Sequence, residues 1–165
     1  MLFYRQFSRK RYQFYLTKYL YYRTIKNSNP KQNIHTLRRS VMTEKEKAAA
    51  GYLYNPNYDM ELLVDLHKCN DLCHEFNQLR PSQRVEQEAL LKQIFAQMGQ
   101  KVCVNTPFWC DYGYNTTVGN RFYANHNCQI LDGGKVTFGD NVFIAPNCTF
   151  TTAEHALDVE QRNEG

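Results

Sequence analysis

Two clusters in the second half of the chain contain residue types that could do chemistry. His126 lies within Tyr123-Ala124-Asn125-His126-Asn127-Cys128, and His155 lies in the polar stretch from Thr151 to Gly165. The ordinary pKa of histidine is near neutrality, so a histidine on a loop beside a rigid scaffold can act as a general base. An exposed loop histidine is more often an inert surface residue, and an asparagine at the corner of a β-helix is normally structural.

The segment that must position these residues repeats every six residues. The first series is Val118, Ala124 and Ile130, accompanied by Phe122 and Cys128, and the second is Phe138, Ile144 and Phe150, accompanied by Val142 and Cys148. A period of six fits neither an amphipathic helix nor an alternating strand, and it is typical of a β-helix in which three short strands make one coil. The alternative is two ordinary hairpins with turns at Gly133-Gly134 and Gly139-Asp140.

In a β-helix the repeating apolar residues point inward, and Asn, Asp and Gly occupy the corners because they tolerate sharp turns. The two series are out of phase by two residues around Asp132-Gly133-Gly134, which predicts a small loop at one corner. Val104, Cys110 and Thr116 extend the step of six backwards, so we expect the ladder of strands to begin near Val104.

Helical patterns precede the ladder and predict a small α-helical cap over residues 42–98. Thr43 and Glu46 form a capping box for a short helix that Gly51 ends. Asp59 is placed to cap a second helix. The expected buried face of that helix consists of Leu62, Leu66, Cys69, Cys73 and Phe76.

A third helix is predicted from a cap at Ser82 to about Met98, with Gly99 as its stop. Its expected buried stripe consists of Leu90, Leu91, Ile94, Phe95 and Met98.

The charge of the chain is unevenly distributed. Of 20 Lys and Arg and 16 Asp and Glu, residues 1–41 hold ten basic and no acidic residues, which leaves ten basic and sixteen acidic residues for 42–165, a balance of −6. The basic, tyrosine-rich stretch could be a nucleic-acid or anionic-membrane arm or a transit peptide. We favour an extension outside the fold, read from an upstream start, with Met42 as the true beginning, and hence neither a nucleic-acid nor a membrane partner.

The six cysteines favour free thiols used as small apolar residues. Cys69 and Cys73 lie four apart on a predicted helix, Cys128 and Cys148 occupy inward ladder positions, and no CxxC pair is present. A zinc site would need closer ligand pairing, so we expect no metal. A hexapeptide protein of the carbonic-anhydrase type would need three zinc-binding histidines, and only His126 and His155 are available in or near the ladder, so we do not favour this class. We expect neither a transmembrane helix nor a signal peptide, and cytoplasmic localisation is the default.

From Met42 to Gly165 the chain resembles the hexapeptide-repeat sugar O-acetyltransferases, specifically the maltose, galactoside and nodulation acetyltransferase group. The matching segments, in order, are MTEKEKAAAGYLY, LCHEFNQLRPS, FYANHNCQILD, VTFGDNVFIAPNCTF and TAEHALDVEQRNEG. The resemblance implies a mainly β fold, a left-handed parallel β-helix behind a helical cap at 42–98, with a partial ladder and catalytic loop at 101–165. It also implies a homotrimer with active sites in clefts between subunits.

The implied reaction is acetyl transfer from acetyl-CoA, as a co-substrate, to a sugar hydroxyl. His155 falls on the family's catalytic histidine and would be the general base. Asn125 and Tyr123 fall on positions that line the acceptor site, and Asp59, or Asn57 beside it, falls near an acceptor-binding position in the cap.

The chain departs from the family's pattern at several points. Ala156 replaces a usual proline, Gly133 stands where some relatives have an acidic acceptor contact, and a cap arginine has no obvious counterpart. Members of the family continue past Gly165 with coils that supply most of the acetyl-CoA pocket, so the resemblance assigns no cofactor-binding residue here. The alternative is a truncated, non-catalytic fragment acting as a binding or structural module.

Overall fold

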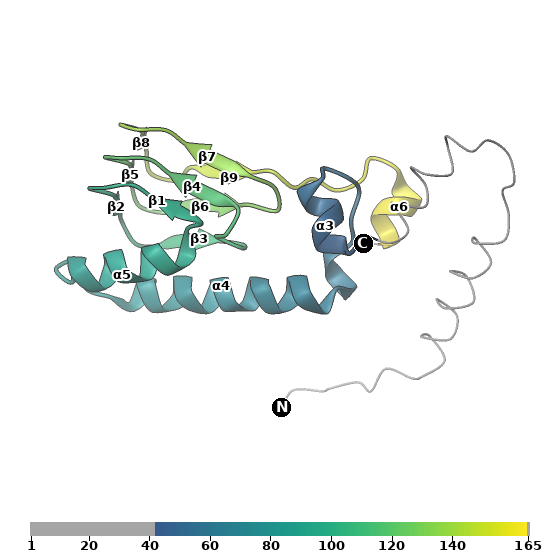
Figure 1. Cartoon of the computed structure of the whole chain (residues 1–165), viewed down its shortest axis with the longest axis horizontal. Coiled ribbons are helices and arrows are strands. Elements are labelled where there is room, and N and C mark those ends of the chain that lie inside the picture. The colour runs from purple at the N-terminus through teal and green to yellow at the C-terminus, as the bar shows by residue number, and fades with distance from the viewer. Residues whose placement is uncertain (1–41, 165) are drawn as a thin grey trace, which may run out of the picture. The chain divides into compact units, whose positions relative to one another are not determined.

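A computed structural model describes residues 42–164 of the chain, which lie within a single compact unit (Figure 1). The predictions made for residues 1–41 therefore lie outside the described residues. No helix in the described part is long and apolar enough to cross a membrane.

Within residues 42–164, nine short strands form three parallel sheets, each of three strands (Figure 1). Sheet A is β1 (Gln97–Met98), β4 (Thr116–Val118) and β7 (Val136–Phe138); sheet B is β2 (Cys103–Val104), β5 (Tyr123–Ala124) and β8 (Phe143–Ile144); sheet C is β3 (Phe108–Cys110), β6 (Cys128–Leu131) and β9 (Thr149–Thr151). Every pairing is parallel, and partners lie 20 residues apart, as in Cys103, Tyr123 and Phe143. The strands therefore make three stacked coils of a left-handed parallel β-helix, and the hairpin alternative is wrong.

The repeating apolar residues point into the coils, as predicted. Val118, Ala124 and Ile130 of the second coil are buried, and their third-coil equivalents Phe138 and Phe150 are partly buried. On the outer face of the third coil, Phe143 is 76% exposed. The core is thus continuous along the ladder and best covered in its first two coils.

Two of the three corners turn with left-handed backbone conformations that recur at the coil spacing. The first corner, between sheets A and B, has positive φ at Lys101, Arg121 and Asn141 (57°, 55° and 59°). The second corner, between sheets B and C, has φ of 61° at both Asn127 and Asn147. Asparagine tolerates this conformation better than most residues do, which explains the Asn-rich corners of the sequence.

Glycines at the first corner allow the coils to approach closely. A Cβ on Gly119 would lie 2.5 Å from the carbonyl carbon of Gly139, and one on Gly99 would lie 2.5 Å from that of Gly119. Real Cβ atoms do not approach backbone atoms this closely, so glycine is required wherever another coil follows.

The third corner, between sheets C and A, contains the predicted extra residues. The loop from Asp132 to Lys135 bulges between β6 and β7, and a second loop from Asp111 to Asn115 bulges between β3 and β4. The second loop was not predicted, because Cys110 and Thr116 are six residues apart and so look like neighbouring members of an uninterrupted repeat. In the structure Cys110 pairs with Ile130 and Thr116 pairs with Val136, which places the extra residues between them.

A helical cap covers the first-coil end of the ladder (Figure 1). It consists of α3 (Glu44–Ala49), the 3₁₀ helix η1 (Pro56–Tyr58), α4 (Met60–Gln78) and α5 (Arg84–Ile94). The predicted capping box at Thr43 and the predicted cap at Asp59 are confirmed. The inner face of α4 buries Cys69, Cys73 and Phe76 against the first coil.

Two predictions about the end of the cap were wrong. The third helix begins after Gln83, not Ser82, and ends at Ile94. Gln97 and Met98 are the first strand of the ladder, which therefore begins before Val104. The reason is tertiary pairing: the backbone N–H of Ala96 donates to Thr116 O at 2.9 Å, so hydrogen bonds to the second coil replace helical ones.

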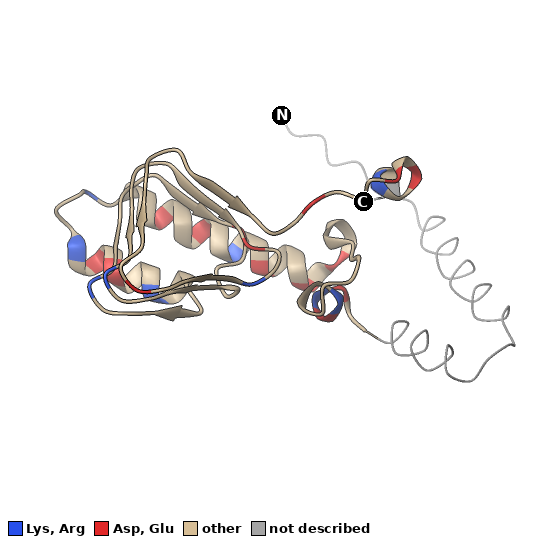
Figure 2. Ribbon diagram, turned by 90° about the horizontal axis from the view of Figure 1, so that it is seen from above, with Lys and Arg blue, Asp and Glu red and all other residues tan. Residues whose placement is uncertain are grey.

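The outer surfaces of the coils carry few charged side chains, whereas charges gather on the helices (Figure 2). A short helix, α6 (Val159–Glu164), follows the ladder and was not predicted. All six cysteines are free, as expected, and four of them are buried.

Candidate active site

Tyr123 and Asn125 lie together at the second corner. Tyr123 is the first residue of β5. Its hydroxyl accepts a hydrogen bond from Asn105 Nδ2 at 2.8 Å, and its ring packs against that of Phe143, with ring centroids 6.0 Å apart. The side-chain Oδ1 of Asn125 accepts from the backbone N–H of His126 at 2.8 Å. Both side chains are half-buried, so the corner presents a braced amide beside an aromatic wall.

The ring of His126 is braced against the backbone at this corner. One ring nitrogen, Nδ1, lies 2.5 Å from the carbonyl oxygen of Thr106 in the first coil. A ring nitrogen that donates to a carbonyl leaves only Nε2 for other chemistry. No group of three metal-ligating side chains occurs within residues 42–164.

His155 lies in the exposed segment that follows β9. The start of this segment is anchored by Thr152, whose backbone N–H donates to Leu131 O at 3.1 Å and whose hydroxyl accepts from the Gly134 N–H at 2.8 Å. Thr151 Oγ1 also donates to Ala153 O at 2.9 Å. The histidine is therefore exposed, but its loop leaves the ladder from a fixed point.

The structure does not bring His155 and Asn125 together within one chain. Asn125 lies before β6 and the His155 loop follows β9, while β6 and β9 run parallel in sheet C. The two residues thus belong to opposite ends of the same strands. One strand of this length separates its ends by about 10 Å or more.

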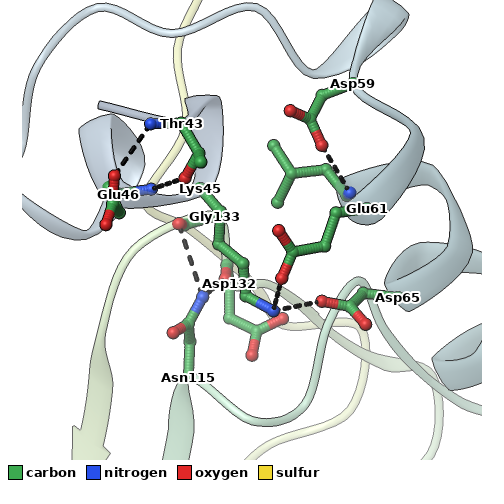
Figure 3. A network of polar contacts seen from close by, with 10 residues as sticks. Thr43, Lys45, Glu46, Asp59, Glu61, Asp65, Asn115, Asp132 and Gly133 are labelled. Atoms are coloured by element: carbon green, nitrogen blue, oxygen red, sulfur yellow. Dashed lines mark hydrogen bonds and ion pairs between the residues drawn. The ribbon is translucent and has the colours of Figure 1, made fainter. Parts of the chain in front are cut away.

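Asp59 belongs to the cap, and its observed role is structural. Its Oδ1 accepts from the backbone N–H of Leu62 at 2.9 Å and so caps α4. Figure 3 shows it beside the carboxylates that surround Lys45.

Lys45 joins the cap helices to the first coil. Its Nζ contacts Glu61 Oε1 at 3.0 Å and Asp65 Oδ2 at 2.6 Å (Figure 3). The same nitrogen lies 4.8 Å from the centre of the Tyr114 ring. Hydrogen bonds to Asp65 and Glu61 raise the pKa of Lys45, so the ammonium remains charged at any ordinary pH. Surface pairs of this kind stabilise weakly, and their effect here is to orient the cap.

The third corner is organised by a carboxylate that sequence reasoning missed. Asp132 is fully buried, and it accepts hydrogen bonds from the Tyr112 N–H at 2.8 Å, from Thr116 Oγ1 at 2.9 Å and from Cys110 Sγ at 3.3 Å. It directly follows β6, at the same spacing of two that separates the buried Cys128 and Ile130, but a polar residue at that position resembles a turn residue in the sequence. This carboxylate ties the loops of two successive coils together.

Burial shifts the ionisation of groups around this corner. It raises the pKa of Tyr112 to about 12, and burial together with Asp132 raises the pKa of Asp111. Burial also raises the pKa of Tyr54, which belongs to the cap segment between α3 and η1.

Tyr54 and the His155 loop meet at Gly133. A Cβ on Gly133 would lie 2.6 Å from the Tyr54 hydroxyl oxygen and 3.2 Å from Ala153 Cβ. The third corner thus gathers the cap, the Asp132 loop and the start of the histidine loop. A separate hollow on the outer side of the helices, lined by residues such as Val64, His67, Asp71 and Gln93, holds none of the predicted site residues.

Comparison with known proteins identifies relatives of this chain. The family model for the maltose acetyltransferase hexapeptide capping motif matches residues 47–99, which are the cap and the start of the ladder. The crystal structure of a maltose O-acetyltransferase from Clostridium difficile 630 is 40% identical, with a TM-score of 0.73, over 75% of this chain and 66% of that one. The chain is similar to the hexapeptide-repeat sugar acetyltransferases.

Other members of the family show the same relation. A galactoside acetyltransferase in complex with coenzyme A is 37% identical, with a TM-score of 0.71, over 75% of this chain and 62% of that one. The Saccharomyces cerevisiae protein named "Putative acetyltransferase YJL218W" is 42% identical over 120 residues, which are 73% of this chain and 61% of that protein. The chain therefore spans less than two thirds of the length of the curated relatives it matches.

Proposed function

We propose that this protein transfers an acetyl group from acetyl-CoA to a hydroxyl group of a sugar, with His155 as the general base. The observation that carries the proposal is the position of His155 on an anchored, exposed loop at the rim of a rigid β-helix in an acetyltransferase family. Relatives of this family are named as maltose and galactoside acetyltransferases, and one was crystallised with coenzyme A.

The chemistry requires a positioned base because an alcohol is a poor nucleophile at neutral pH. His155 takes the proton of the sugar hydroxyl while that oxygen attacks the thioester carbonyl. When the carbon–sulfur bond breaks, the imidazolium returns the proton to the departing thiolate. This direct transfer needs no cysteine nucleophile, in agreement with thiols that serve as core residues.

We further propose that a complete site contains residues from two copies of the chain. Asn125 and His155 lie at opposite ends of the strands of sheet C, so an Asn125 close to His155 must come from a neighbouring copy. A homotrimer with a cleft at each contact satisfies this requirement, because a closed ring repeats one contact between successive subunits.

The remaining predicted residues fit acceptor binding. Asn125 can bind the sugar or orient the imidazole through its Nδ2, since its Oδ1 is used by His126. Tyr123 supplies the aromatic wall next to it. Asp59 caps α4 with Oδ1, and its Oδ2 has no hydrogen-bond partner within residues 42–164, so this oxygen is available to a sugar hydroxyl.

The test is turnover of acetyl-CoA by the whole chain with glucose, maltose and a galactoside as acceptors. We expect His155→Ala to lower kcat by about 10² to 10⁴-fold, the usual contribution of a general base. His74→Ala is the matched control, because His74 is exposed on α4 and belongs to no part of the proposed site.

Two results would contradict the proposal. Equal turnover by His155→Ala and the wild-type chain would remove His155 from the chemistry. A folded wild-type chain without turnover on any acceptor would instead favour the non-catalytic binding module.

A further inference from the structure

The cap brings one unused hydroxyl group to the third corner. Tyr54 is half-buried, and within residues 42–164 its hydroxyl forms no hydrogen bond. Burial raises the pKa of this phenol, so it remains protonated at neutral pH and can act as a donor. A half-buried donor without a partner is a group that a ligand can satisfy.

Gly133 leaves the space that this hydroxyl occupies. A side chain at 133 would begin 2.6 Å from the Tyr54 oxygen and 3.2 Å from Ala153 Cβ, well inside normal contact distances. Because Ala153 is two residues before His155, at most about 7 Å of chain separates the two α-carbons. The hydroxyl of Tyr54 therefore lies next to the root of the histidine loop.

Each of the three segments that meet here is held by its own hydrogen bond. The Tyr54 segment is fixed by Glu44 Oε2, which accepts from the Asn55 N–H at 2.7 Å. The Gly133 loop is fixed by Asn115 Nδ2, which donates to Asp132 O at 2.8 Å. The histidine loop is fixed by Thr152, whose hydroxyl accepts from the Gly134 N–H. The convergence is therefore built into the fold before any ligand arrives.

We propose that Tyr54 is an acceptor-binding residue, whose hydroxyl donates a hydrogen bond to an oxygen of the sugar that His155 deprotonates. The proposal rests on the function proposed above. A sugar carries several hydroxyl groups, so one can meet His155 while another meets Tyr54. The aromatic ring of Tyr54 at the same point offers an apolar edge to the C–H groups of the sugar.

The first test is Tyr54→Phe in the whole chain, which keeps the ring and removes the hydroxyl. We expect KM for the acceptor to rise about 3- to 10-fold, the effect of one neutral hydrogen bond, while KM for acetyl-CoA and Tm stay unchanged. Tyr58→Phe is the matched control, because Tyr58 lies in the adjacent 3₁₀ helix and is 78% exposed. Unchanged acceptor KM in Tyr54→Phe would overturn the proposal.

The second test moves the hydroxyl without removing it. Gly133→Ala must push the Tyr54 oxygen aside, so we expect a rise in acceptor KM similar to that of Tyr54→Phe. In Gly134→Ala, the control, the new Cβ would lie 3.5 Å from Thr152, an ordinary contact. If both changes act through this hydroxyl, the double variant Tyr54→Phe/Gly133→Ala is no worse than either single one. Additive effects would contradict the shared cause.

A third measurement does not depend on turnover. In a chain labelled with ¹³Cζ-tyrosine, the signal that Tyr54→Phe removes should shift on titration with the preferred sugar, whereas the Tyr58 signal should not. A shift of the Tyr54 signal without acetyl transfer by the wild-type chain would contradict the proposed function and still support Tyr54 as a residue that contacts the sugar. Turnover without a shift would keep the function and exclude Tyr54.

Discussion

The second and third corners of the β-helix carry the two halves of the proposed site, and they are built differently. The second corner turns on Asn127 and Asn147, equivalent residues of successive coils with the same φ. Their side chains bond to one another, from Asn127 Nδ2 to Asn147 Oδ1 at 2.9 Å. This corner follows from local backbone preference repeated at the coil spacing.

The third corner depends on contacts between segments that are distant in sequence. Asp132 binds the loop of the preceding coil, Lys45 links the cap to Tyr114, and Tyr54 reaches Gly133 from the cap. The second corner therefore repeats one local conformation from coil to coil, whereas the third corner is assembled from segments that are distant in the sequence. The repeated corner holds Asn125 and Tyr123 in the scaffold, and the assembled corner holds the root of the His155 loop.

The largest expected effect concerns the distance between these corners. Asn125→Ala and His155→Ala should each lose most activity. If each site takes Asn125 from one subunit and His155 from its neighbour in a closed ring, a mixture of the two variants should regain activity when it is unfolded and refolded together. Random assembly of an equal mixture places both intact residues at about a quarter of the sites, so we expect about a quarter of wild-type activity. The measurement is turnover of the refolded mixture beside separately refolded variants. Activity no greater than that of the two separate variants would show that both residues act within one chain.

The next effect is on the stability of the assembled corner. Asp132→Ala removes the acceptor of the Tyr112 N–H and of Thr116 Oγ1, and we expect it to lower the free energy of unfolding by about 2 to 4 kcal/mol. Asp132→Asn should lose less, because its oxygen can still accept from Tyr112. Denaturant titration of both variants checks this order, which equal losses would contradict.

A smaller loss is expected at the repeated corner. Alanine disfavours the left-handed conformation that Asn127 adopts at a φ of 61°, because it has a Cβ but no polar group to bond the nearby backbone. We expect Asn127→Ala to lower the free energy of unfolding by about 1 to 2 kcal/mol. Asn127→Gly keeps the backbone conformation and should cost about 0.5 kcal/mol. If alanine and glycine at this position unfold at the same denaturant concentration, backbone conformation is not what the asparagine provides.

The smallest effect is a dependence on pH at the assembled corner. Burial raises the pKa of Asp111, so its ionised form is disfavoured in the folded protein and stability falls as the pH rises through that pKa. Asp111→Asn should therefore raise Tm at pH 7, and the difference should disappear in acid.

Asp140 should show the opposite sign. Its pKa is lowered, because its carboxylate accepts from the Asn120 N–H at 2.6 Å, so its stabilising effect is present at neutral pH and lost in acid. Asp140→Asn should thus lower Tm slightly at pH 7 and not in acid. Thermal melts at pH 2.5 and pH 7 compare the two variants, because only a pH well below the ordinary aspartate pKa removes the charge of Asp140. A shift of the same sign for both variants at pH 7 would contradict this account.

The same contrast explains what could be predicted from sequence. The series through Val118 and Phe138 predicted the coils, because each inward residue repeats a local rule that needs no knowledge of partners. Thr43 and Asp59 were identified as caps for the same reason, since a cap bonds to amides a few residues away. The acceptor roles of Asn125, Tyr123 and Asp59 stay predictions, as does the role of His155.

Features that depend on distant partners were missed. Gln97 and Met98 extend a helical pattern, but pairing with the second coil makes them a strand. Asp132 is polar and follows a strand, so it resembles a turn residue until the three donors around it are known. The approach of Tyr54 to Gly133 has no local signature, because the two residues meet only through the packing of the cap.

Pairing at intervals of 20 residues restricts how this protein can change in length. Inserting or deleting a number of residues other than 20 within the strands or the first two corners would place inward residues opposite outward ones or corners opposite strands, whereas the loops of the third corner lie outside the pairing. Duplicating one whole coil, residues 116–135, would keep every pairing and move the His155 loop away from the cap by about 4.8 Å, the spacing between strands. The distance from the cap to the start of the histidine loop is therefore set by the number of coils and changes in steps of one strand spacing.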